Sequence, residues 1–198
     1  MCLQLRSPAL RSPDPLTLQD STMTSTAPAA VAADLLDSLL HIVPDSTLHA
    51  VRHAREKVAS ATQASQALFF AADLDDNLSL SERLWVAYYA AYLTPQPLLS
   101  AHYLAQLRAL GASEHTRSSL EAGELDALDD ARLGAILRFT RTLIESPVHG
   151  DQAALTALQQ QGLSTEEIVV LGQLIAFLSY QVRLVAGLGA MQAIGEAP

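Results

Sequence analysis

The chain has 198 residues, of which 49% are apolar and only 5% aromatic, and its formal net charge is −9 at neutral pH. This length suits one domain with an extension better than it suits two domains. Phosphate backbones and anionic lipid surfaces repel such a charge, so neither nucleic-acid nor membrane partners are expected.

The N-terminal region carries little sign of structure. Residues 1–27 hold the single cysteine, Cys2, and three prolines, and lack the continuous apolar stretch of a secretory signal. We predict a disordered tail over 1–27 and a single all-α domain over 28–198, with Met1 and Met23 as alternative starts. One thiol cannot form an internal disulfide, and the chain has no uncharged apolar run of about 18 residues, so a cytoplasmic location is expected.

From Ala29 onward the pattern is helical almost throughout. Ala and Leu dominate, and no strict alternation of apolar and polar residues competes with the helical period. The sequence therefore predicts an all-α fold. The expected helices cover residues 35–40, about 46–70, 80–94, 97–110, 129–146, 151–161, 165–179 and 180–193.

The second of these helices contains two histidines one turn apart. His49 and His53 share one face, as a pair of metal ligands would. Two ligands do not make a site, and the neighbouring Arg52, Arg55 and Lys57 repel cations. A solvated helix face is therefore the favoured interpretation, with no metal and no cofactor.

An internal repeat organises the rest of the domain. "LSLSERLWVAYYAAYL" (78–93) aligns without gaps on "LSTEEIVVLGQLIAFL" (163–178). Both copies open with a capping box, in which a serine and a glutamate three residues later satisfy each other's main-chain amides. The boxes are Ser79 with Glu82 and Ser164 with Glu167. Each copy is expected to continue into a second apolar helix after a break, which predicts two related helical hairpins.

The stretch "RFTRTLIESPVHGDQAALTALQQQGLSTEEIVVLGQLIAFLSYQVRLVAGLG" (138–189) resembles the end of alkylhydroperoxidase D-like, or carboxymuconolactone decarboxylase-like, proteins. The "GLS-x-EEIV" turn, the apolar helix after it and a late arginine carry the resemblance, which extends loosely over residues 35–192. It implies the helical fold of that family and a homo-oligomer.

Peroxidases of that family use Glu-x11-Cys-x2-Cys-x3-His, in which the cysteines exchange a disulfide while Glu and His move protons. Aligning the pattern on His102 puts Leu98 and Pro95 at the cysteine positions and Arg83 at the glutamate position. The resemblance therefore implies a family member that has lost its thiol peroxidase centre. It predicts an oligomeric binding or accessory protein.

The alternative is a cysteine-independent lyase of the decarboxylase type, acting on a small organic acid. The resemblance then makes His102 the acid or base, and Arg83 or Arg183 binds the substrate carboxylate. Tyr92, on the same predicted hairpin, is expected to line the substrate cleft. The third interpretation is a purely structural interaction protein. In it His102 is hydrogen-bonded to a neighbouring helix, Arg183 forms a structural or inter-subunit ion pair, and Tyr92 belongs to the core.

Overall fold

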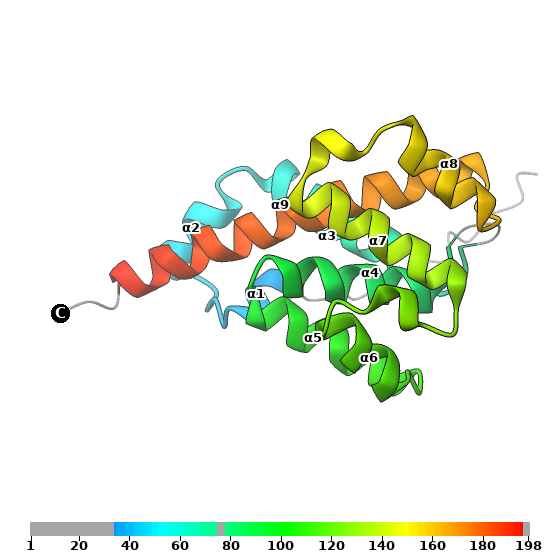
Figure 1. Ribbon diagram of the computed structural model, residues 1–198. Helices are drawn as coiled ribbons and strands as arrows, with labels where there is room; N and C mark the ends of the chain where they lie inside the picture. Colours follow the sequence, from blue (N-terminus) through cyan, green and yellow to red (C-terminus); the bar gives the residue numbers. More distant parts are fainter. Residues whose placement is uncertain (1–33, 75–77, 196–198) are drawn as a thin grey trace, which may run out of the picture. The chain divides into compact units, whose positions relative to one another are not determined.

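A computed structural model describes residues 34–74 and 78–195, which belong to one unit of the chain, residues 33–198. Over these residues the chain forms nine α-helices and no strand, which confirms the all-α class (Figure 1). The predicted tail, 1–27, lies outside the described residues. The helices are α1 Leu35–Leu39, α2 Thr47–His53, α3 Glu56–Phe69, α4 Leu80–Leu93, α5 Pro97–Ala109, α6 Glu114–Glu121, α7 Ala131–Glu145, α8 Gln152–Gln160 and α9 Thr165–Gly195, with short 3₁₀ helices at Leu125–Ala127 and Pro147–His149.

Helix α4 is the centre of the fold. Its residues 83–91 are all buried, so this helix presents no face to solvent over more than two turns. It packs against α5, α7 and α9, which surround it in Figure 1. Leucine, tyrosine and alanine side chains from these helices form one continuous core.

Both predicted capping boxes are present. Ser79 Oγ accepts from the Glu82 amide at 3.2 Å, and Glu82 returns a carboxylate oxygen to the Ser79 amide at 2.7 Å. At the start of α9, Ser164 and Glu167 repeat this pair of bonds at 3.1 and 2.7 Å. The two copies of the repeat therefore begin their helices with the same local chemistry.

Arg132, in the first turn of α7, joins the two boxes. Its Nε donates to Glu82 at 2.8 Å, one terminal nitrogen donates to Glu167 at 2.5 Å, and the other donates to the carbonyl of Gly162 at 3.2 Å. Burial lowers the pKa of Arg132, but the two carboxylates outweigh this effect and leave the pKa raised. One guanidinium thus ties together the first turns of α4, α7 and α9.

The repeat breaks down after its first helix. The first copy forms the α4–α5 hairpin, but α9 runs without a break through Ser179 and Tyr180, so the predicted second hairpin is wrong. Residues 173–186 contain neither proline nor glycine, and nothing in that stretch stops a helix. Packing on both its N-terminal and C-terminal halves holds the 31-residue helix together.

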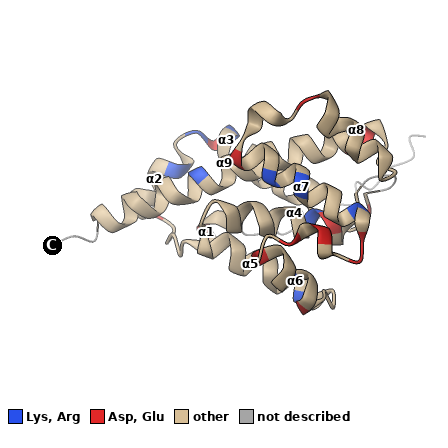
Figure 2. Cartoon of the chain, in the orientation of Figure 1, with Lys and Arg blue, Asp and Glu red and all other residues tan. Residues whose placement is uncertain are grey.

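Helix α9 is also long and apolar enough, by length and composition only, to cross a membrane. Charges are sparse along it in Figure 2, and Arg183 interrupts the uncharged run. Within its most apolar 18-residue window, 44% is buried inside the protein. A core helix passes the same test, so this property by itself assigns α9 no membrane role.

The helices of the structure differ from the predicted ones at two further places. The predicted helix over 46–70 is divided at Arg55, whose φ of −118° and ψ of 74° are not helical. Helix α6 was not predicted, although Ser113 caps it and Gly123, at a φ of 77°, follows its end. Its sequence is mostly polar, which hides the apolar period used to find helices.

A closed polar network crosses the core between α3, α5 and α9. The hydroxyl of Tyr103 donates to Gln181 at 2.6 Å and lies 3.2 Å from the amide oxygen of Gln66, which also accepts from Gln181 at 2.9 Å. All three residues are buried. No buried side-chain nitrogen or oxygen of the described residues lacks a partner, so the network fixes the register of the three helices.

We expect Arg132→Gln to lower the free energy of unfolding by about 1 to 2 kcal/mol, because it removes two charge-assisted hydrogen bonds from partly buried carboxylates. Urea denaturation measures this change. The matched control is Arg138→Gln, whose partner Asp126 is 93% exposed, and it should cost less than about 0.5 kcal/mol. Equal effects of the two substitutions would contradict the bridging role of Arg132.

Candidate functional site

His102 lies on α5 and is held by its own helix. Its Nε2 is 2.7 Å from the amide nitrogen of Gln106, one turn further on, and its ring meets the edge of Tyr103 at 5.1 Å. An amide nitrogen only donates, so Nε2 accepts and the imidazole is neutral. Burial also lowers the pKa of His102. A neutral imidazole at physiological pH can act as a base, but its free lone pair is already used by Gln106.

Arg83 is 1% exposed and is fully used by main-chain carbonyls. Its Nε donates to Leu78 at 2.9 Å, and its terminal nitrogens donate to Phe69 and Ala71. Burial lowers the pKa of Arg83, and Glu82 offsets part of this effect. These contacts hold the end of α3 against the start of α4, and they leave the guanidinium turned toward the backbone.

Arg183 and Tyr92 lie at the surface. Arg183 is exposed and donates to the carbonyl of Ser179 in the same helix at 2.7 Å, so it needs no buried partner. Tyr92 is 41% exposed, and its hydroxyl donates to the carbonyl of Glu121 at 3.2 Å. Tyr92 also lines an open groove of about 740 Å³, together with Leu93, Pro95, Gln96, Pro97 and Ser100.

The four predicted site residues do not converge in the described part of the chain. His102 contacts Gln106 and Tyr103, whereas Arg83 and Arg183 bind carbonyls of other residues. The groove beside Tyr92 includes neither arginine. The arrangement therefore does not bring an acid or base to a carboxylate-binding group.

Helix α6, absent from the sequence-based prediction, adds a polar cluster beside α4. Arg117 bonds to both Glu114 and Glu121, and the hydroxyl of Tyr88 donates to Glu121. Burial, followed by the bond to Glu121, raises the pKa of Tyr88 to about 12. The phenol is thus a hydrogen-bond donor at neutral pH, and it fastens α6 to the central helix.

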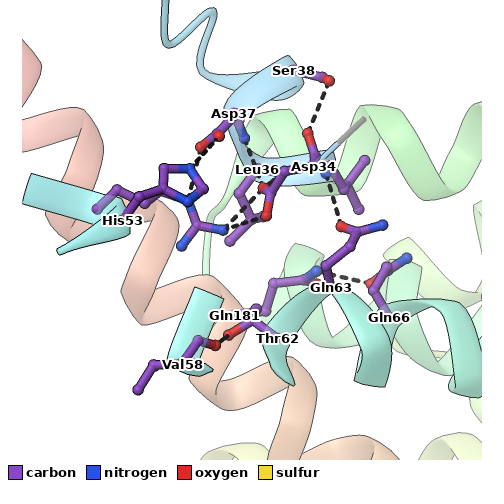
Figure 3. A network of polar contacts seen from close by, with 12 residues as sticks. Asp34, Leu36, Asp37, Ser38, His53, Val58, Thr62, Gln63, Gln66 and Gln181 are labelled. Carbon is purple, nitrogen blue, oxygen red and sulfur yellow. Dashed lines mark hydrogen bonds and ion pairs between the residues drawn. The ribbon is translucent and has the colours of Figure 1, made fainter. Parts of the chain in front are cut away.

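A second polar cluster joins α1 to α2, and the sequence pattern indicated only its two histidines. Asp37 Oδ2 lies 2.7 Å from His53 Nε2, and the rings of His49 and His53 are 4.4 Å apart. Asp37 and His53 face each other between the two helices in Figure 3. One donor atom from each of the three side chains lies within 4.8 Å of the other two.

Arg52 supports this cluster from the next position on α2. Its Nε donates to Asp37 Oδ1 at 2.8 Å, and one terminal nitrogen reaches both oxygens of Asp34 at 2.9 Å. Asp34 in turn caps α1 by accepting from the amides of Leu36 and Asp37. Burial lowers the pKa of Arg52, but the two carboxylates outweigh it and leave the pKa raised.

The chain matches no protein-family model, and no curated protein sequence matches it. The resemblance to the alkylhydroperoxidase D-like family therefore stays a prediction from the sequence.

We expect Arg83→Met to lower the free energy of unfolding by about 3 kcal/mol or more, because it leaves three carbonyls without their donor. Arg183→Met, on an exposed position, should change it by less than about 0.5 kcal/mol. Urea denaturation compares the two variants. A nearly neutral Arg83→Met would show that the guanidinium is available for a ligand.

We expect the His102 side chain to titrate below the ordinary histidine pKa of 6.5, because burial disfavours the imidazolium. The unfolded chain then takes up its proton at a higher pH than the folded chain, so stability falls as the pH drops below about 6.5. Side-chain NMR during a pH titration measures the pKa, and His102→Gln identifies the resonance and flattens the pH dependence of stability. A pKa at or above 6.5 would refute this assignment.

Proposed function

We propose that this chain is an alkylhydroperoxidase D-like, carboxymuconolactone decarboxylase-family protein that has lost thiol peroxidase chemistry and serves as an oligomeric binding or accessory protein. The proposal rests on which residues stand at the three positions where the family pattern has its glutamate and its two cysteines. Pro95 precedes α5, Leu98 is 40% exposed in its first turn, and Arg83 is locked among carbonyls. None of these side chains supplies a nucleophile.

The surroundings of His102 support the same proposal. In a thiol peroxidase the histidine moves a proton to or from a thiolate, and that partner must lie within hydrogen-bond reach. Here the partner at 2.7 Å is the amide of Gln106, which does not exchange a proton with substrate. The single cysteine, Cys2, lies outside the described residues.

The lyase alternative needs an acid or base and a carboxylate anchor in one cleft. His102 has a suitable neutral form, but Arg83 is turned to the backbone. The guanidinium of Arg183 donates to the carbonyl of Ser179 in its own helix. A small organic acid as ligand therefore ranks below the binding or accessory role.

The proposal includes self-association, because apolar side chains remain exposed along α3 and α9. Val58, Leu68, Val169, Tyr180 and Ile194 are between 41 and 77% exposed. A shallow apolar groove of about 390 Å³ runs between the two helices, lined by Val58, Ala61, Phe177 and Tyr180 among others. Burying such a surface between copies of the chain is favourable.

The net charge of −9 disfavours nucleic acid as a partner, and the single cysteine favours a cytoplasmic location.

The test is a peroxide-reduction assay with a dithiol reductant, run on the full chain and on Cys2→Ser beside an active thiol peroxidase. We expect no turnover from either form, because no thiolate stands beside His102. Light scattering of the same sample should give a mass that is a multiple of 21.2 kDa.

Peroxide turnover that Cys2→Ser abolishes would overturn the loss of peroxidase chemistry. Carbon dioxide release from small carboxylic acids that disappears in His102→Ala would favour the lyase instead. A mass of a single chain would remove the oligomer from the proposal.

A further inference from the structure

The cluster formed by Asp37, His49 and His53 has the composition of a transition-metal site. Two imidazoles and one carboxylate bind Zn²⁺ and other first-row divalent ions in proteins. Their donor atoms already lie within 4.8 Å of one another. We propose that these three residues bind one divalent transition-metal ion, of which Zn²⁺ is the representative, independently of the function proposed above.

The backbone brings the three ligands together from two neighbouring helices. His49 and His53 are one turn apart on α2, so their rings point from the same face and lie 4.4 Å apart. Asp37 reaches them from α1, and its Oδ2 is 2.7 Å from His53 Nε2. Ligands about 2.0 to 2.1 Å from zinc are roughly 2.9 Å apart at a right angle and roughly 3.4 Å apart at a tetrahedral angle. Asp37 and His53 therefore need to separate by less than about 1 Å to admit an ion, and the donor atom of His49 needs to close in by at most about 1.4 Å.

The charges also favour a cation, contrary to the argument from neighbouring residues in the sequence. Arg52 does not oppose the ion, because Asp34 and Asp37 both pair with it. With neutral histidines, these two carboxylates and one guanidinium sum to a charge of −1. Arg55 and Lys57 are exposed, where solvent and salt screen their charges.

Arg52 and Asp34 further hold the carboxylate ligand in place. The Arg52 side chain is only 3% exposed and occupies Oδ1 of Asp37, which leaves Oδ2 directed at His53. Asp34 fixes Arg52 through both of its oxygens. Such outer contacts orient metal ligands and raise the affinity of a site. Three protein ligands leave at least one coordination position for water or another small ligand.

The experiment is calorimetric titration of Zn²⁺ into the full chain in a Cys2→Ser background, which removes the thiol as a competing ligand. We expect one saturable site per chain. His49→Ala and His53→Ala should each weaken binding by at least about tenfold, and the control His115→Ala, on α6, should leave it unchanged. Cobalt substitution should give visible absorption bands that His49→Ala removes.

His49→Ala is the decisive variant, because it leaves the bonds among Asp34, Asp37 and Arg52 intact. Far-ultraviolet circular dichroism of each variant checks that the helices are retained. Zinc should also raise the melting temperature of the Cys2→Ser chain and not that of His49→Ala. No saturable binding, or equal affinity in His49→Ala and His115→Ala, would overturn the proposal.

Discussion

The fold depends on the requirement that α4 be covered on every side. A helix whose side chains are apolar around its whole circumference is stable in water only inside a shell of other elements. Helices α5, α7 and α9 provide that shell. The buried Arg83 in the first turn of α4 follows from the same constraint, since a cation at that position needs hydrogen-bond acceptors from its own chain. The carbonyls at the end of α3 meet that need, and they fix how the chain enters the central helix.

Local signals in the sequence were sufficient for the features that depend on neighbouring residues. The two capping boxes were predictable, because each involves residues only three positions apart. The break at Arg55 was not predictable in this way, since neither glycine nor proline marks it. Tertiary packing decides such a position, and no local preference records it.

The candidate sites show the same limit more clearly. His102 was found from a pattern, but its partner, Gln106, and the separate carbonyl partners of Arg83 are visible only in three dimensions. The charge around His53 could not be judged from the sequence, because a list of neighbouring residues counts Arg52 as a free positive charge. Asp34 and Asp37 neutralise it from another helix. The sequence alone therefore does not reveal which charges are compensated by residues elsewhere along the chain.

The network of Gln66, Tyr103 and Gln181 has a consequence for synthesis on the ribosome. Gln181 stands 115 positions after Gln66, and it completes the hydrogen bonds of both other residues. Until α9 has left the exit tunnel, the nascent chain holds two polar side chains in a core that cannot yet close around them. The earlier helices of this domain therefore cannot reach their final packing before α9 has been made. Synthesis of α9 determines when the domain becomes resistant to aggregation and to proteases.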